Sequence, residues 1–201
     1  MSETPQVTKY AAILLAAGRS SRMGAFKPLL PFGNSTIIEA CLDQIEAAGI
    51  IDIVVVIGHR WDELRLSLAH RRVSFAVNPD PDSEMSASIA AGVQALDQTV
   101  TAVYLALADQ PRIPAKIYSV LARRHRNGEK IVVPEFEGHR GHPVLVDLSL
   151  RDELAKLDEC GGLRGFLDTH TREVYRRTVD CPYVRMDVDT PEDYRNLTED
   201  V

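Results

Sequence analysis

Hydrophobic and polar positions along this chain fall into two kinds of segment that alternate. Residues 51–57 (IDIVVVI) form a near-continuous β-branched run, which is typical of a strand buried on both faces of a sheet. Residues 60–70 instead space their large apolar side chains at helical intervals, at Trp61, Leu64 and Leu68. The same alternation recurs along the chain, and we interpret it as a βαβα pattern.

Strands are predicted at residues 11–17, 51–57, 73–77, 102–108 and 173–179, and another begins at 131–133. Helices are predicted at residues 60–70, 85–96, 117–125, 150–157 and 163–167. Two more begin at Thr36 and Thr190; Thr36 opens a capping box, and Gly49 is suited to end its helix. Residues 138–146 are expected to return antiparallel, because a short Gly-rich connection leaves no room for a crossover helix.

These elements predict an α/β fold with a mainly parallel, Rossmann-like sheet, helices on both faces and an antiparallel return strand. The 201 residues fit one domain, 1–201, because a chain of this length can bury most of its apolar surface in a single core. Residues 1–9 are expected to form a flexible N-terminal extension.

Composition narrows the classes of protein that fit. The net charge of -6 argues against a nucleic-acid-binding protein, whose binding surface would be basic. No apolar run approaches the roughly 20 residues of a membrane span, and the N-terminus lacks the layout of a signal peptide, so we expect a cytoplasmic protein. Cys41, Cys160 and Cys181 are odd in number and widely spaced, which argues against a disulfide framework or a zinc cage.

The most informative polar segment follows the first predicted strand, where Gly18 and Gly24 flank a loop that contains Arg19 and Arg22 and leads to Lys27. Ligands of open α/β sheets bind at the carboxyl ends of the strands, and these cations suit a polyphosphate there. The glycine spacing excludes a P-loop and a GxGxxG fingerprint, and no GxSxG elbow is present. An ordinary solvated turn is the plainer alternative.

LLAAGRSSRMGAFK (residues 14–27) resembles the signature LAAGxSxRMGxxK of nucleotidyltransferases similar to molybdenum cofactor cytidylyltransferase, the MobA-like NTP transferase family. Three later segments agree with that family in the expected order: LALADQP at 105–111, GHRGHPVLV at 138–146 and MDVDTPEDY at 186–194. The resemblance therefore spans nearly the whole chain, and four ordered motifs are more specific than the first alone.

The resemblance implies that the first loop wraps the triphosphate of an incoming nucleotide. The implied nucleotide-binding residues are Leu15, Ala16, Ala17, Gly18, Arg19, Ser20, Arg22, Met23, Gly24, Lys27, Ser86, Ser88 and Asp109. Relatives are usually richer in glycine around residues 82–88, so Glu84 and Ser86 depart from the family pattern.

Carboxylates in two motifs suggest a metal site. Asp109 follows a predicted strand, where an isolated acid would more often cap the next segment. Beside a polyphosphate loop, metal binding becomes the better interpretation, because Mg²⁺ is held by one or two carboxylates together with substrate phosphates. By resemblance, Asp109 and Asp189 coordinate this Mg²⁺. A helix-start signal accounts for residues 190–193 but not for Asp189, and a share for Asp187 stays open.

The resemblance implies transfer of CMP from CTP to the terminal phosphate of molybdenum cofactor (molybdopterin), with release of pyrophosphate. Phosphate monoesters have a second pKa of about 6, so the nucleophile is largely dianionic at neutral pH and needs no general base. Catalysis is then positioning and charge neutralisation, and the predicted catalytic residues are Lys27, Arg22 and Asp109.

The acceptor is expected to bind at Arg140, Gly141, His142 and Pro143. The two histidines in this segment invite a zinc interpretation, but further ligands at suitable spacing are lacking. A purely structural hairpin remains an alternative. Residues 160–165 depart from the family pattern; Arg164 is a second candidate for an acceptor phosphate, with a simple helix-entry turn as the alternative.

Two other functions stay open: transfer of guanylyl or another nucleotidyl group to a different phosphorylated acceptor, and a carrier that delivers molybdenum cofactor without chemistry. Lys27, Asp109 and Asp189 argue against the carrier, which has no use for a metal–triphosphate site. Ala17 favours CTP, because guanylyl-transferring relatives typically have glycine there. A molybdenum hydroxylase is the partner protein that could receive the product.

Overall fold

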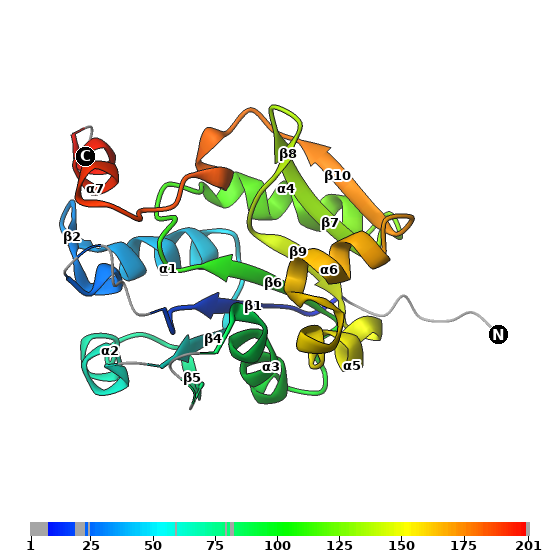
Figure 1. The fold of residues 1–201 in the computed structure, drawn as a ribbon, viewed down its shortest axis with the longest axis horizontal. Helices are drawn as coiled ribbons and strands as arrows, with labels where there is room; N and C mark the ends of the chain where they lie inside the picture. The colour runs from blue at the N-terminus through cyan, green and yellow to red at the C-terminus, as the bar shows by residue number, and fades with distance from the viewer. Residues whose placement is uncertain are drawn as a thin grey trace.

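The computed structural model describes residues 8–18, 23, 25–58, 60–78, 80 and 83–199. Its centre is an eight-stranded sheet with the order β10-β7-β9-β6-β1-β4-β5, in which β8 also pairs with β7 (Figure 1). The strands of this sheet are β1 (Tyr10–Leu15), β4 (Asp52–Ile57), β5 (Ser74–Val77), β6 (Ala102–Leu107), β7 (Ile131–Phe136), β8 (His139–Arg140), β9 (Val144–Asp147) and β10 (Val174–Thr178). A separate small hairpin is formed by β2 (Pro31–Phe32) and β3 (Ser35–Thr36).

Parallel pairing dominates the sheet, which confirms the predicted fold class. β1 is parallel to both of its neighbours, β4 and β6, and β5 extends this parallel set to one edge. β9 is antiparallel to β6 and β7, and β8 is antiparallel to β7. These two strands are the expected return of residues 138–146. Because β1, β4, β5 and β6 share one direction, their carboxyl ends meet at one edge of the sheet.

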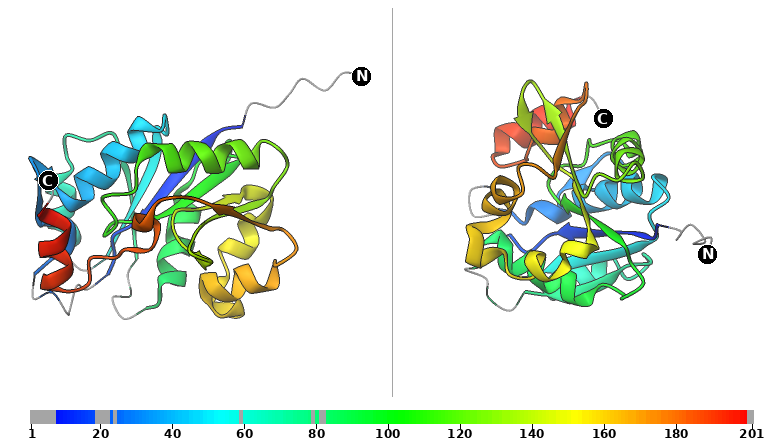
Figure 2. Two further views of the ribbon diagram at one scale, coloured as in Figure 1. Left: turned by 90° about the horizontal axis from the view of Figure 1, so that it is seen from above. Right: turned by 90° about the vertical axis from the view of Figure 1, so that its right-hand side faces the viewer.

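Two apolar clusters cover the two faces of the sheet, and successive residues of β1 belong to opposite clusters. Ala12 and Leu14 pack in the cluster that contains residues of α1 (Ile37–Ala47), α2 (Trp61–Ser67) and α4 (Ala115–His125). Ala11 and Ile13 pack in the cluster that contains residues of α3 (Met85–Ala95), α5 (Arg151–Leu154) and α6 (Gly162–Thr169). This period of two is what a strand buried on both faces requires. Figure 2 shows the helices on both sides of the sheet.

The close approach of α3 to the sheet depends on Gly92. A Cβ atom added at Gly92 would lie 2.7 Å from the Ile13 Cγ2 atom and 3.0 Å from the Val56 Cγ2 atom. A side chain there would therefore push α3 away from β1 and β4. With glycine, α3 can pack directly on Ile13 and Val56.

The predicted capping box at Thr36 is present, and the helix expected to begin at Thr190 starts with a second capping box. The Thr36 hydroxyl accepts from the Glu39 backbone N–H and the Glu39 carboxylate accepts from the Thr36 N–H, so α1 begins where predicted, and Gly49 follows its end with a φ of 81°. Thr190 and Asp193 cap α7 (Pro191–Thr198) in the same way. Leu197 of α7 packs with Ile37 at the start of α1, so the last helix is anchored beside the first (Figure 1).

The prediction of one helix over residues 150–157 is wrong. This part of the chain consists of η2 (Leu148–Leu150), α5 and η3 (Leu157–Cys160), three short turns that follow one another. Leu150, Leu154 and Leu157 are all buried. The apolar spacing therefore reflects side chains buried against the sheet. Short turns can bury such side chains as well as a continuous helix can. The small β2–β3 hairpin and the 3-10 turns η1 (Lys27–Leu29) and η4 (Pro182–Arg185) were not predicted.

Residues 1–7 of the predicted N-terminal extension lie outside the described residues. Lys9 is already tied to the sheet: its backbone N–H donates to the Thr101 hydroxyl at 2.9 Å, and its ammonium lies 3.1 Å from Asp52. Within the described part of the chain, no helix combines the length and apolar character needed to cross a membrane.

Candidate active site

Gly18, where the first loop begins, and Asp109 lie at the same carboxyl edge of the sheet. Leu15 and Leu107 end their strands in register, and the Ala108 N–H still donates to the Leu15 carbonyl at 3.1 Å. Beyond this bond both segments leave the sheet, one toward Gly18 and the other at Asp109. Two motifs that are far apart in the sequence are therefore brought to one place.

A cavity of about 400 Å³ opens at this edge, and we call it the first-loop cavity. Its lining residues are Leu15, Ala17, Gly18, Asn78, Asp80, Ser83, Glu84, Met85, Ser88, Leu107, Asp109, Asp187 and Asp189. A neighbouring recess of about 80 Å³ is lined by Leu15, Ala16, Gly18, Lys27, Pro28, Ala108 and Asp109. The two spaces share Leu15, Gly18 and Asp109, so Lys27 lies next to the first-loop cavity.

Lys27 is a buried cation held between two of the predicted metal ligands. Its side chain is only 11% exposed, and its ammonium lies 2.6 Å from Asp189 Oδ1 and 4.0 Å from Asp109 Oδ2. The position follows from η1, which turns the chain inward directly after the first loop and buries Lys27 together with Pro28. Three residues from three motifs thus form one cluster of charges.

Asp109 is held in an environment that disfavours its negative charge. Burial, together with the nearby charges of Asp187 and Asp189, raises the pKa of Asp109 to about 6, although Lys27 acts in the opposite direction. Asp187 accepts a hydrogen bond from Gln110 Nε2 at 2.7 Å. Three carboxylates that repel one another around a single buried ammonium provide a site that an additional cation would stabilise.

The segment before α7 presents Asp189 without using it as a helix cap. The Thr190 hydroxyl and the Asp193 carboxylate satisfy the first turn of α7 between them, and Asp193 also accepts from the Asp189 backbone N–H at 3.1 Å. The Val188 N–H donates to the Asp109 carbonyl at 3.2 Å, which ties this segment to the end of β6. The Asp189 carboxylate is therefore directed at Lys27 and Asp109.

This donor set fits a cation shared with a substrate better than a protein-enclosed metal. Asp109 and Asp189 supply carboxylate oxygens, which are the ligands that Mg²⁺ prefers in proteins. Among the described residues, no group of three or more His, Cys, Asp or Glu side chains is arranged to hold a metal by itself. The remaining ligands of a metal here would have to come from phosphate oxygens and water.

Ser88 and Ser86, both predicted to contact the nucleotide, have different surroundings. Ser88 lines the first-loop cavity, and its hydroxyl accepts from Asn78 Nδ2 at 2.9 Å. Ser86 is buried in the first turn of α3 and is not among the lining residues of that cavity. Asn78 was missed by the sequence analysis, although a polar residue directly after a parallel strand, here β5, is a usable signal.

Several predicted residues lie outside the described residues, namely Arg19, Ser20, Arg22 and Gly24. Met23 is described, and it packs beside the small apolar cluster of Ile37, Val188 and Leu197. It does not line the first-loop cavity. In this structure Met23 therefore lies against residues at the start of α1 and of the α7 segment.

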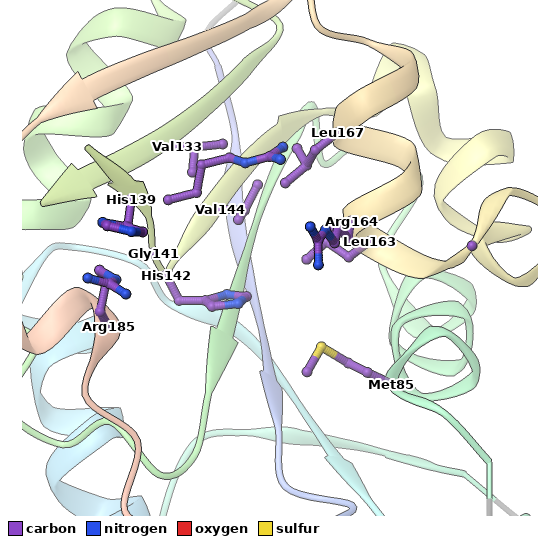
Figure 3. A pocket seen from close by; sticks show the side chains of 12 residues that line it. Met85, Val133, His139, Gly141, His142, Val144, Leu163, Arg164, Leu167 and Arg185 are labelled. Carbon is purple, nitrogen blue, oxygen red and sulfur yellow. The ribbon is translucent and has the colours of Figure 1, made fainter. Parts of the chain in front are cut away.

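A larger cavity of about 590 Å³, which we call the hairpin cavity, lies between the β7–β9 segment and α6 (Figure 3). Its lining residues are Met85, Val133, His139, Arg140, Gly141, His142, Val144, Gly161, Leu163, Arg164, Leu167 and Arg185. Met85 lines this cavity and the first-loop cavity as well, so the two spaces are neighbours. Three of the four predicted acceptor residues line the hairpin cavity, and Pro143 does not.

Gly141 and His142 join the hairpin to η4. The His142 N–H donates to the Val184 carbonyl at 2.8 Å. A Cβ atom at Gly141 would lie only 2.3 Å from that same oxygen, so glycine is required for the contact. The contact places Arg185, the last residue of η4, over the hairpin cavity. Arg185 was missed because nothing in its local sequence marks it as part of a site.

The two histidines of the hairpin do not form a metal pair with each other. His139 Nδ1 lies 2.8 Å from the Glu137 carbonyl, whereas His142 Nδ1 lies 3.4 Å from the Leu105 carbonyl on a different strand. Carbonyl oxygens only accept, so each Nδ1 carries the proton. Arg140 between them forms an ion pair with Asp168 at 2.6 Å.

Comparison with known proteins gives a consistent set of relatives. Residues 12–174 match the family described as "MobA-like NTP transferase domain". The chain is 26% identical over 188 residues to the molybdenum cofactor cytidylyltransferase of Escherichia coli, covering 93% of this chain and 94% of that protein. It is also 31% identical over 177 residues to nicotine blue oxidoreductase of Paenarthrobacter nicotinovorans, covering 83% of each chain.

Among solved structures, the protein Rv0371c of Mycobacterium tuberculosis superposes with a TM-score of 0.84 at 29% identity, covering 96% of this chain and 98% of that chain. A second structure of the same mycobacterial protein is a complex with manganese; it has a TM-score of 0.80 at 27% identity and covers 96% of this chain and 100% of that chain. The fold is therefore shared along almost its whole length.

Proposed function

Because the chain belongs to the MobA-like NTP transferase family and is a nucleotidyltransferase, we propose that it transfers CMP from CTP to the terminal phosphate of molybdenum cofactor. The observation that carries the proposal is the buried ammonium of Lys27 between Asp109 and Asp189, next to a cavity at the carboxyl edge of the sheet. Pyrophosphate is the leaving group of this reaction.

The nucleotide occupies the first-loop cavity, with its phosphates toward Lys27 and its sugar and base toward α3. An ammonium group carries three donors, so Lys27 can keep its contact with Asp189 while it donates to a phosphate oxygen. Arg22, which lies outside the described residues, is the second cation proposed for the phosphates. Ser88 and Asn78 present hydroxyl and amide groups on the other side of the cavity.

Asp109 and Asp189 would hold Mg²⁺, which supplies charge neutralisation and alignment for the triphosphate when it is bound. The protein's own part is to fix the positions of the two carboxylates. Asp109 is fixed by the end of β6, and Asp189 by the capped start of α7 and by the Val188–Asp109 backbone bond. Rigid placement lowers the entropic cost of bringing two anionic substrates together.

The acceptor enters from the hairpin cavity, which adjoins the first-loop cavity at Met85. A phosphate monoester with a second pKa of about 6 is largely dianionic at neutral pH, so it can attack without a general base. The arginine side chains of the hairpin cavity offset its charge. The reacting oxygen then approaches the α-phosphorus in line with the departing pyrophosphate.

The preference for CTP is proposed from Ala17, which lines the first-loop cavity. A methyl group at this position takes up space that glycine would leave open, and this favours the smaller pyrimidine base. One methyl group in a pocket is worth about 1–3 kcal/mol, which corresponds to a clear preference rather than exclusion of GTP.

Pyrophosphate release is the test of this proposal. The purified protein is incubated with molybdenum cofactor and each of the four NTPs, with and without Mg²⁺, and the dinucleotide product is identified by mass spectrometry. We expect CTP to give the highest kcat/KM and omission of Mg²⁺ to abolish turnover. A preference for GTP would overturn the cytidylyl assignment, and binding of molybdenum cofactor with no pyrophosphate release would favour a carrier.

One relative bears the name of an oxidoreductase, so similarity at this level does not by itself decide the reaction. Charge-neutralising groups at the first-loop cavity favour phosphoryl chemistry, because a redox reaction has no need of Lys27 between two carboxylates. If the product is the cytosine dinucleotide of molybdenum cofactor, the protein that receives it is a molybdenum hydroxylase.

A further inference from the structure

The hairpin cavity is strongly cationic although the protein as a whole is acidic. The chain has a net charge of -6. Arg140, Arg164 and Arg185 nevertheless line this cavity, and no Asp or Glu is among its described lining residues. In the first-loop cavity, by contrast, the described lining residues include acids and no Lys or Arg. Among the described residues, the arginines line the hairpin cavity and the acids line the first-loop cavity that adjoins it.

The three arginines differ in how their charge is compensated. Arg140 forms an ion pair with Asp168 at 2.6 Å, and this hydrogen bond lowers the pKa of the Asp168 carboxyl. Arg164 also lowers the pKa of Asp168 through its charge, but by less than Arg140 does, so it shares a carboxylate that Arg140 already contacts. For Arg185, no ion pair is found within the described residues. Both guanidinium groups therefore face the hairpin cavity with less carboxylate compensation than Arg140 has.

These two guanidinium groups come from opposite sides of the cavity. Arg185 is placed by η4, which the His142–Val184 backbone bond holds against the hairpin, and its side chain lies beside His139 (Figure 3). Arg164 comes from α6 on the other side, and the His142 ring lies between them (Figure 3). An arrangement of this kind binds two anionic groups better than a single one.

The middle of the cavity is suited to a neutral group. His142 Nδ1 donates to the Leu105 carbonyl at 3.4 Å, which leaves the lone pair of Nε2 to face the cavity. Burial lowers the pKa of His142 and so favours this neutral form. A lone pair accepts from an N–H or O–H group and repels an anion, while Val144 and Leu167 add an apolar wall.

We propose that the acceptor carries a second anionic group in addition to the phosphate that reacts, and that Arg164 and Arg185 bind the two groups separately across a neutral, flat centre. This inference rests on the proposed function in one respect, namely that the hairpin cavity receives the acceptor. A volume of about 590 Å³ is within the range for a small organic ligand. Arginine suits both ends because it forms forked, charge-assisted hydrogen bonds with phosphates and carboxylates.

Two simple probes that differ by one charge test the proposal by calorimetric binding, without turnover. Phenyl phosphate has one anionic group on a flat ring, and 4-carboxyphenyl phosphate has two at opposite ends. We expect 4-carboxyphenyl phosphate to bind about tenfold more tightly to the wild-type protein, since a second charge-assisted pair is formed. In Arg164→Gln and in Arg185→Gln this advantage should fall to about twofold or less.

Arg172→Gln serves as the matched control, because Arg172 is exposed and does not line the hairpin cavity. It should keep the full difference between the probes. Equal binding of the two probes to the wild-type protein would overturn the proposal, as would an undiminished difference in both Gln variants. The outcome is separable from the proposed function: a wild-type protein that prefers the doubly charged probe but releases no pyrophosphate from CTP refutes the reaction and leaves the two-anion site standing.

Discussion

Lys27 shows how a buried positive charge can be stabilised by nearby carboxylates. A lone ammonium with 11% of its side chain exposed would be costly, but the contact with Asp189 and the proximity of Asp109 offset its desolvation. The arrangement is reciprocal, because Lys27 in turn lowers the pKa of Asp109 against the effect of burial. Removing the Lys27 ammonium should therefore alter the ionisation of Asp109, and removing a carboxylate should make the buried ammonium less stable.

Replacing Lys27 separates its charge from its packing. In Lys27→Met the apolar stem is retained and the ammonium is lost, so we expect a folded protein whose kcat/KM falls at least tenfold. Loss of a hydrogen bond to a charged group costs about 1.5–3 kcal/mol, which corresponds to this change in rate. Steady-state pyrophosphate release measures the effect, and circular dichroism checks the fold. Wild-type kcat/KM in Lys27→Met would contradict the phosphate-binding role.

Asp189 and Asp187 are a natural matched pair, two residues apart on one segment. Asp189 faces Lys27, whereas Asp187 accepts from Gln110. We therefore expect Asp189→Asn to raise the Mg²⁺ concentration required for half-maximal activity at least tenfold, and Asp187→Asn to change it by about threefold or less. Titration of activity with Mg²⁺ measures both. A larger effect in Asp187→Asn would transfer the metal role from Asp189 to Asp187.

At the residue scale, the sequence indicates the placement of a side chain where a motif ties it to a fixed point in a strand or loop. The positions of Asp109 and Lys27 at the sheet edge could be anticipated in this way, since each adjoins the end of a buried strand or a glycine-rich loop, whereas their roles stay predictions. Gln110 and Arg185 could not, because their contributions depend on contacts with segments distant in the sequence. Contacts between residues that are distant in the sequence leave no local pattern, so a single sequence does not reveal them.

At the scale of elements, predictions were most accurate where side chains satisfy the backbone locally. The capping boxes at Thr36 and Thr190 set the starts of α1 and α7, because the hydroxyl and the acid three residues later satisfy exposed N–H groups within one turn. Residues 150–157 failed for the opposite reason. Their apolar spacing is fulfilled by packing of η2, α5 and η3 on the sheet, and packing alone does not require a continuous helix.

The two caps provide a test of what α7 contributes. Loss of a capping hydroxyl costs about 0.5–2 kcal/mol. We expect Thr36→Ala to lower the free energy of unfolding by this amount, since α1 is part of the main core. Thr190→Ala should lower global stability less, because α7 buries little, but it should impair Mg²⁺ dependence by loosening Asp189. Urea denaturation and Mg²⁺ titration of both variants distinguish these effects. If both variants lost the same stability and kept the wild-type Mg²⁺ dependence, α7 would not position Asp189.

At the scale of the whole molecule, the two ends of the parallel strands differ in how their polar and charged groups are paired. The carboxyl edge gathers carboxylates that repel one another, and this repulsion lowers the stability of the fold at a place suited to binding a cation. At the opposite edge, polar groups are paired: Tyr10 at the start of β1 contacts His125 of α4 at 3.3 Å, and His125 contacts Asp147 at the end of β9 at 2.9 Å. This network joins α4 to two strands of the sheet, far from the first-loop cavity.

The paired edge should make stability depend on pH. Burial alone would raise the pKa of Asp147, but hydrogen bonds from Ser149 and His125 outweigh it and lower that pKa. A lowered carboxyl pKa stabilises the folded state above the unfolded value of about 3.9, and this contribution is lost as the pH falls through the folded pKa. Asp147→Asn should therefore reduce the free energy of unfolding by about 1 kcal/mol at pH 7, because the hydrogen bonds of a partly exposed carboxylate contribute modestly. The difference from wild type should shrink below about pH 4, while kcat for pyrophosphate release stays unchanged at pH 7.

Chemical denaturation at a series of pH values measures this, with Asp158→Asn at an exposed position as the control. A loss of stability that persists undiminished in acid would show that Asp147 contributes through its shape and neutral hydrogen bonds, and not through its charge.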